Sequence, residues 1–288
     1  MKPEYIGKTK VNKIEEYVDR LDPSFVFKKF NNYIIEENQS WLLPDFVEKK
    51  TLLLYFSFHS YLIETPRYKI LIDTCVGNHK SRPLPNWNMR NSNFLQKFKQ
   101  FNLDRSMIDF VMCTHLHADH VGWNTLLDNG KWVPTFPNAE YIFSKKDYDF
   151  FNNVKEGDQG YLSMIDSVRP IVEHSQAKLV DDSFSIDETI HLEPTPGHTP
   201  GHICIKLNSE NEHAIFTGDL IHHPIQVCQP DLETNFCFDP KLAVKTRKEF
   251  IENNTDQNVI IFPAHFSNHT KGLIKSSKMG SVYKVIKS

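Results

Sequence analysis

The chain has 288 residues, of which 40% are hydrophobic and 12% aromatic; this composition predicts a globular protein with a full core and excludes a disordered chain. Its formal net charge of −3 lacks the basic excess that is typical of nucleic-acid-binding proteins, so no nucleic-acid partner is expected. No apolar run approaches about 18 residues, so no membrane span or membrane partner is predicted.

The N-terminal segment and the cysteines indicate the cellular setting. The first residues contain no apolar stretch with a small-residue cleavage site, so no secretory signal is predicted. The cysteine number is odd and no CxxC pair occurs, which argues against a disulfide framework and against a cysteine-type zinc site. We expect each cysteine to be a buried small hydrophobic residue without a catalytic role, in a reducing, cytoplasmic setting. The five are Cys75, Cys113, Cys204, Cys228 and Cys237.

The first half of the chain contains a polar lead followed by a strand pattern. Residues 1–50 are polar with interspersed aromatic residues, and we interpret them as an N-terminal extension that packs near the functional site. Residues 51–65 and 68–73 are rich in branched and aromatic side chains and flank a proline-containing turn, which predicts a hairpin. Glycine, proline and asparagine predict a loop over 75–92, and apolar spacing predicts a helix over 94–101.

Four later apolar runs share one arrangement. The runs at 109–113, 187–194, 213–217 and 258–262 are short and bounded by Gly and Pro, so they read as buried strands. Candidate metal ligands follow directly after each of them, which is a common way to hold functional loops at one edge of a sheet. The alternation with helical patterns predicts a layered α/β architecture in a single domain spanning residues 1–288. Those helical patterns cover 120–128, 145–154, 160–174 and 240–252.

The strongest signal in the chain is the sequence HLHADH at 115–120. Residue frequencies predict roughly 0.002 chance matches to this spacing in the chain. Residues two apart in an extended segment point to the same side, so His115 and His117 can bind one ion. A turn at Ala118 then directs Asp119 and His120 towards a second position. Neutral imidazoles and carboxylates are ligands that suit zinc.

Three more candidate ligands follow strands later in the chain. His198 lies in the Pro/Gly-braced sequence TPGHTPGH, Asp219 follows a strand in FTGDL and suits a carboxylate shared by two ions, and His265 follows a strand in FPAHF. A lone histidine at a strand end is more often structural than a ligand. We therefore expect no functional role for the isolated histidines His59, His174, His191, His213 and His269.

In this order, THLHADH, TPGHTPGH, FTGDL and FPAHF resemble the successive metal-binding motifs of the metallo-β-lactamase superfamily, over about residues 51–270. The resemblance implies a four-layer αββα sandwich, the metallo-β-lactamase fold, with the site along one edge. It implies two zinc ions, with Mn, Fe or Co as alternatives. It also implies the ligand assignment: His115, His117 and His198 on one ion, Asp119, His120 and His265 on the other, and Asp219 as the bridge.

The LIDT sequence at 71–74 also resembles the family pattern. By this resemblance Asp73 supports the site through a hydrogen bond to a ligand imidazole or to nearby backbone. The alternative is a turn or capping carboxylate.

Several branches of the superfamily fit this chain poorly. Two-zinc β-lactamases often have Cys where this chain has Asp219, and flavin-linked oxygen reductases have Glu at the place of His117 together with a flavodoxin domain. RNA-processing members need a basic arm, against which a net charge of −3 argues. Thioesterases of the glyoxalase-II type add a C-terminal helical domain, whereas about 20 residues follow His265 here.

The sequences GNHKSRP, HADHVGWN and DLIHHPIQ resemble segments of the acyl-homoserine-lactone lactonases and of related methyl-parathion-hydrolase-like enzymes. Many lactonases have Tyr three residues past the bridging Asp. This chain has His222 at that position, and in this respect it resembles the methyl-parathion-hydrolase-like subgroup more closely. The implied activity is a metal-dependent hydrolase that uses a metal-bridged hydroxide on a lactone or related ester, or on a phosphotriester. A quorum-quenching role would follow from lactone hydrolysis.

Two residues are predicted to act in catalysis. Asp119 would carry a proton to the leaving group, and His222 would donate a hydrogen bond to the developing oxyanion, with a structural histidine as the alternative. The aromatic candidates for an apolar pocket wall, with a core role as their alternative, are Trp87, Trp123, Phe136 and Phe266.

Two other activities stay open. One is a mononuclear-iron persulfide dioxygenase-type oxidoreductase, which metal content would distinguish from a two-zinc enzyme. The other is a thioesterase of the glyoxalase-II type. A non-enzymatic binding protein is disfavoured by the complete ligand set. The expected partner is a small-molecule substrate, and the sequence is compatible with a homodimer.

Overall fold

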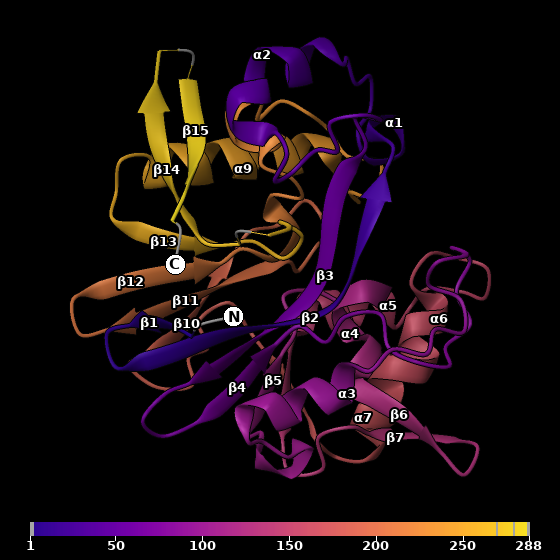
Figure 1. Ribbon diagram of the computed structural model, residues 1–288. Coiled ribbons are helices and arrows are strands. Elements are labelled where there is room, and N and C mark those ends of the chain that lie inside the picture. The colour runs from indigo at the N-terminus through magenta and orange to yellow at the C-terminus, as the bar shows by residue number, and fades with distance from the viewer. Residues whose placement is uncertain (1–2, 269, 279, 287–288) are drawn as a thin grey trace. The chain divides into compact units, whose positions relative to one another are not determined.

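The computed structural model describes residues 3–268, 270–278 and 280–286 (Figure 1). The chain divides into two compact units, and each unit is built from two segments of the chain. Unit 1 comprises Met1–Glu16 and Phe58–Phe184, and unit 2 comprises Tyr17–Ser57 and Ser185–Ser288. Two of the three boundaries fall within long strands, β2 (Thr9–Leu21) and β3 (Leu54–Glu64), and the third, after Phe184, lies outside the helices and strands.

Unit 1 contains most of a seven-stranded mixed sheet with the order β1-β2-β3-β4-β5-β8-β9. The predicted hairpin is confirmed, because β3 pairs with β4 in antiparallel register. Strands β4, β5, β8 and β9 run parallel, and the middle strands are almost wholly apolar and buried, as parallel strands usually are. The remaining strands are β1 (Glu4–Ile6), β4 (Lys69–Ile72), β5 (Phe110–Met112), β8 (Glu140–Ser144) and β9 (Ala177–Val180).

The helices of unit 1 are short, and a small separate hairpin follows one of them, η3 (Gly122–Asn124), in the chain. The α-helices are α3 (Phe94–Lys97), α4 (Ala118–Val121), α5 (Lys145–Phe151), α6 (Tyr161–Ser163) and α7 (Arg169–Glu173). The 3₁₀-helices are η1 (Phe98–Phe101), η2 (Arg105–Met107) and η3 (Gly122–Asn124), and η4 (Met164–Val168) is a π-helix. The separate hairpin consists of β6 (Thr125–Asp128) and β7 (Lys131–Pro134).

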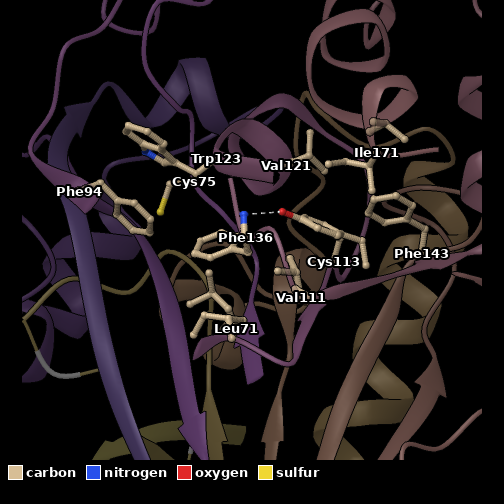
Figure 2. Close-up of a cluster of buried hydrophobic side chains, with 14 of the residues drawn as sticks. Leu71, Cys75, Phe94, Val111, Cys113, Val121, Trp123, Phe136, Phe143 and Ile171 are labelled. Carbon is tan, nitrogen blue, oxygen red and sulfur yellow. Dashed lines mark hydrogen bonds between the residues drawn. The ribbon is translucent and has the colours of Figure 1, made fainter. Parts of the chain in front are cut away.

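The core of unit 1 is rich in aromatic side chains (Figure 2). The Trp123 and Phe94 rings stack with centroids 5.5 Å apart, and Phe136 N–H donates to the Tyr141 hydroxyl at 3.0 Å. Trp123 and Phe136 are therefore core residues and not pocket-wall residues. Phe266 of unit 2 is also fully buried and packs on Phe46.

Unit 2 contains a six-stranded sheet with the order β10-β11-β12-β13-β14-β15. Strands β12 and β13 are parallel, and the other neighbours are antiparallel. The strands are β10 (Ile190–Pro194), β11 (Ile203–Ser209), β12 (Glu212–Phe216), β13 (Val259–Phe262), β14 (Gly272–Ser277) and β15 (Gly280–Val285). The helices are α1 (Pro23–Val26), α2 (Tyr33–Leu42), η5 (Gly218–Leu220), α8 (Ile225–Cys228) and α9 (Pro240–Asn254).

The four predicted strands that precede ligand motifs are all present, as β5, β10, β12 and β13. The helix predicted over 120–128 is wrong beyond Asn124, because β6 begins at Thr125 and pairs with β7. The two-residue loop Asn129-Gly130 has positive φ at both positions, 48° and 78°, as the type I′ hairpin turn requires. This Asn-Gly signal outweighs the apolar spacing on which the helix prediction depended.

Residues 1–50 are more structured than their composition indicates. They contain the 13-residue strand β2 and the ten-residue helix α2. Strand β2 carries lysines and glutamates throughout, and its buried face includes Asn12 and Glu16, so hydrophobic alternation is weak. None of the helices in the described part of the chain has the length and hydropathy of a membrane-spanning helix.

Candidate metal centre

In unit 1, two neighbouring parallel strands bring polar residues to one edge of the sheet. Ile72 at the end of β4 pairs with Met112 at the end of β5. The residues that follow these strand ends, Asp73 and the segment 113–120, therefore lie side by side. Loops at the carboxyl ends of parallel strands are the usual place for ligand sites in α/β sheets.

The HLHADH segment arranges its side chains in two pairs. His115 Nε2 lies 3.1 Å from His117 Nδ1. His117 has extended dihedrals and precedes α4, so the chain turns and presents Asp119 and His120 from the first turn of the helix. Asp119 Oδ2 lies 3.6 Å from His120 Nε2. His115 and His120 are buried, whereas His117 and Asp119 are half-buried, so the HLHADH segment presents one half-buried histidine and one half-buried carboxylate.

Asp73 supports this segment through hydrogen bonds. Its Oδ2 lies 2.8 Å from His120 Nδ1, and its carboxylate accepts hydrogen bonds from Thr114 N and Thr114 Oγ1, both at 2.8 Å. The predicted hydrogen bond between Asp73 and a candidate ligand imidazole is thus confirmed. A proton on Nδ1 leaves the Nε2 lone pair of His120 for a metal ion, which is the usual arrangement of metal-binding histidines.

In unit 2, three candidate ligands reach one edge of the six-stranded sheet for a similar reason. Strands β12 and β13 are parallel and end together at the pair Phe216–Phe262, so Asp219 and His265 leave the sheet at the same edge. The turn between β10 and β11 also lies there, because Ile205 near the start of β11 pairs with Phe216. His198 is in that turn.

The Asp219 carboxylate is surrounded by imidazoles. Its Oδ2 lies 3.3 Å from His198 Nε2 and 3.3 Å from His222 Nε2, and its Oδ1 lies 2.9 Å from His265 Nε2. All four residues are buried. Because its two oxygens face different histidines, Asp219 has the disposition of a carboxylate that two cations can share.

Local packing determines the position of His198. Gly197 has φ of +132°, and a Cβ at this position would lie 2.3 Å from Ala243 N in α9, so only glycine fits between the loop and the helix. The residue before a candidate ligand is therefore held against a long helix. His198 Nδ1, on the far side of the ring from Asp219, lies 3.5 Å from Cys237 Sγ.

His202 is a supporting residue that sequence reasoning missed. Its Nε2 accepts a hydrogen bond from Asp219 N at 3.0 Å, and its Nδ1 therefore donates to Thr195 Oγ1 at 2.8 Å. The imidazole thus fixes the backbone of Asp219. The available sequence signal was the second histidine of TPGHTPGH, four residues after His198.

His222 and His223 are adjacent but differ in their contacts. Burial lowers the pKa of His222 even though Asp219 opposes the shift, so His222 is a neutral imidazole beside Asp219. Its backbone N–H donates to Gln226 Oε1 at 2.8 Å. His223 donates from Nε2 to Phe46 O at 3.1 Å and accepts from Ile225 N at 3.3 Å; burial lowers its pKa to about 4. His223 is a structural residue that no motif indicated.

All five cysteines are free thiols. Cys75, Cys113 and Cys204 are fully buried, and burial raises the pKa of each, as expected for inert core residues. Cys237 differs from the expectation of a small hydrophobic residue, because its Sγ contacts His198 Nδ1 and lies 3.0 Å from Thr234 Oγ1.

The donors in each unit fit a divalent metal ion. Imidazole nitrogens and carboxylate oxygens are the ligands of zinc and related ions, and in each unit they converge to within about a hydrogen-bond length of one another. The outer nitrogen of each of four imidazoles contacts a polar group, which orients the inner nitrogen. These pairs are His115 with Thr114, His120 with Asp73, His198 with Cys237, and His265 with Ser57 O.

The sequence matches a known family and known proteins. The family model of the metallo-beta-lactamase superfamily matches residues 58–265. The lactamase-like protein nscB of Trichophyton verrucosum is 31% identical over 178 residues, which cover 59% of this chain and 50% of that protein. The N-acyl homoserine lactonase of Bacillus thuringiensis is 23% identical over 229 residues, or 74% and 82% of the two chains. This chain thus spans about half the length of the nscB relative.

Solved structures share the fold over nearly the whole chain. The hydrolase AbOPH of the beta lactamase superfamily matches with a TM-score of 0.82 and 21% identity, covering 99% of this chain and 97% of that one. AidC, a dizinc quorum-quenching lactonase in complex with a product, matches with a TM-score of 0.81 and 19% identity, covering 100% and 97%. The predicted α/β fold class, the metallo-β-lactamase fold, is confirmed. The chain belongs to the metallo-beta-lactamase superfamily.

Proposed function

We propose that this protein is a dinuclear zinc hydrolase of lactones or related esters. The observation that carries the proposal is the Asp219 carboxylate, whose two oxygens face His198 and His265 at 3.3 and 2.9 Å. Asp219 is buried, and a buried carboxylate needs a cation to balance it. Because each of its two oxygens faces a different candidate ligand imidazole, this carboxylate suits two ions better than one.

The proposal joins the ligands of the two units into one centre. The family model extends over parts of both units, which supports one functional domain that includes both. A domain spanning residues 1–288, with residues 1–50 packed near the site, stays a prediction. We assign one ion to His115, His117 and His198, the other to Asp119, His120 and His265, and Asp219 to both. Zinc is the preferred metal because of the nitrogen-rich donor set, and Mn, Fe and Co are the alternatives.

When bound, the ions would lower the pKa of water and stabilise negative charge on substrate oxygens. The protein's own residues supply the proton transfer and the orientation. Asp119 is half-buried, so its carboxylate can take a proton from the attacking water and pass it to the leaving oxygen. His222 is neutral and can offer one N–H to the oxygen on which charge develops.

Two observations support the substrate class. The B. thuringiensis relative is an N-acyl homoserine lactonase, and AidC is a lactonase whose structure contains N-hexanoyl-homoserine as product. His222 stands where many homoserine lactonases have Tyr, which favours aryl esters or phosphotriesters as a second substrate class. A quorum-quenching role, a cytoplasmic location and a homodimer stay predictions.

The test is a substrate screen on metal-free protein and on the same protein after zinc is restored. We expect zinc-dependent hydrolysis of at least one acyl lactone or aryl ester. Persulfide oxidation that requires a single iron, with no hydrolysis by the zinc form, would contradict the proposal and favour the oxidoreductase alternative. Thioester hydrolysis without lactone hydrolysis would favour the thioesterase alternative.

A further inference from the structure

A carboxylate that no motif includes lies buried in unit 1. Glu16 is in strand β2 and is 5% exposed. Its Oε2 accepts from Val76 N at 3.0 Å, and its Oε1 accepts from Ser92 Oγ at 2.8 Å and Trp123 Nε1 at 2.8 Å. A buried carboxylate is costly unless its oxygens accept hydrogen bonds. Three donors from three different segments therefore stabilise it here.

The segment that Glu16 contacts is strained. Asp73 and Cys75 have left-handed φ values of 54° and 51°, and Gly77 has 82°. Non-glycine residues adopt such values at a cost of order 1–3 kcal/mol each, and they persist only where surrounding contacts determine them. Asp73 is also the residue whose carboxylate contacts His120. The conformation of residues 73–77 therefore sets the direction of that carboxylate.

The backbone after the HLHADH motif lies directly against this strained segment. Thr74 N donates to His120 O, Gly122 N donates to Cys75 O and Trp123 N donates to Thr74 O, each at 2.7 Å. A Cβ at Gly122 would lie 1.9 Å from Val76 O, so the two backbones are in direct contact. Little room is left for either segment to shift without the other.

We propose that Glu16 is a positioning residue that fixes residues 73–77 so that Asp73 points at His120. Glu16 contacts both sides of the backbone pair, through Val76 on the strained segment and through the Trp123 indole on the segment after the motif (Figure 2 shows Trp123 beside Cys75 and Phe94). The inference rests on the proposed function, in which His120 is a metal ligand.

The first test is the zinc affinity of Glu16→Gln, measured by competition with a chromophoric chelator. The amide retains the size of the side chain but turns an N–H₂ group towards at least one of the three donors, so one hydrogen bond is lost. Loss of an outer contact of a metal site typically costs 10–100-fold in affinity, and we expect about tenfold here because Glu16 acts through Asp73. Glu15→Gln is the matched control: Glu15 is the next residue of β2, on its opposite face and half-exposed, and its replacement should leave the zinc affinity unchanged.

A double-mutant cycle distinguishes positioning from general stability. If Glu16 acts through Asp73, Glu16→Gln should lower zinc affinity in the wild-type background and have no further effect in Asp73→Asn. Additive losses in the double variant would overturn the proposal, as would a fall in the free energy of unfolding of the metal-free protein with unchanged zinc affinity.

A conservative variant covers the case in which Glu16→Gln does not fold. Glu16→Asp keeps the charge but withdraws it by one methylene, and it should give a smaller loss of zinc affinity. Failure of both variants to fold would make Glu16 a stability residue and would also overturn the inference. Failure of the wild-type protein to bind zinc would instead contradict the proposed function, so the two ideas fail by different results.

Discussion

Replacing His222 tests whether this residue is a catalytic hydrogen-bond donor or a structural histidine. Burial lowers the pKa of the His222 imidazole, which favours its neutral form. Its Nε2 is 3.3 Å from Asp219 Oδ2, so its ring lies beside the candidate ligands of unit 2. We expect His222→Ala to keep the fold and both metal ions and to lose one to two decades of turnover. That loss corresponds to about 1.4–2.7 kcal/mol of transition-state stabilisation, at or below the usual value of one oxyanion donor. His222→Tyr should restore a donor and shift preference towards acyl-homoserine lactones.

The neighbouring residue provides the control. His223 makes two buried hydrogen bonds, to Phe46 O and from Ile225 N, and its ring stacks on Phe56. His223→Ala leaves these backbone groups without their partner, which should cost about 1–3 kcal/mol of stability, while turnover per folded, metal-loaded molecule stays near the wild-type value.

The assay is steady-state kinetics of both variants with metal content and urea unfolding measured on the same samples. Unchanged turnover in His222→Ala would make His222 merely structural, and the argument for aryl ester or phosphotriester substrates would then be dropped. Loss of metal from His222→Ala would mean that the residue is a ligand and not a donor.

Three further predictions follow from single residues. Asp219→Ala should lose measurable affinity for both ions by metal analysis, because a shared ligand is removed; retention of one tightly bound ion would contradict the bridging role. Cys237→Ala should weaken zinc binding about tenfold in a chelator competition, because the Cys237 thiol contacts His198 Nδ1 and orients that imidazole. Cys228→Ala is the control and should bind zinc as the wild type does. Equal zinc affinities of the two variants would show that the thiol contact has no effect on binding. Burial lowers the pKa of Lys80 from 10.5 to about 7, so between these pH values the unfolded chain binds more protons than the folded chain, and Lys80 makes the free energy of unfolding rise with pH. Urea unfolding at pH 7 and pH 9 should show a smaller rise for Lys80→Met than for the wild type. An equal rise in both proteins would refute the lowered pKa of Lys80.

The sequence predicted the candidate ligands because their signal is local. The segment at 115–120 carries its own spacing, and His198, Asp219 and His265 each follow an apolar run that forms a strand. The sheet then brings those strand ends to one edge in each unit. The prediction for Asp73 also held, since LIDT directly follows β4.

Residues that support the ligands could not be found in this way. Glu16 contacts residues 60 or more positions away, and Cys237 meets His198 across 39 positions. Only the folded chain brings these pairs together, and neither residue lies in a recognisable motif. Strand β2 is not evident from the sequence because charged residues on a half-buried strand conceal its alternation. The helix-like apolar spacing over 120–128 conceals the hairpin whose turn is Asn129-Gly130.

A zinc titration tests most directly whether this protein is a two-metal hydrolase. Zinc is added to metal-free protein in known equivalents, and both the bound metal and the rate of hydrolysis of the preferred ester are measured at each step. We expect that binding and activity both reach their plateau at two equivalents per chain. A plateau at one equivalent, or full activity without added metal, would contradict it.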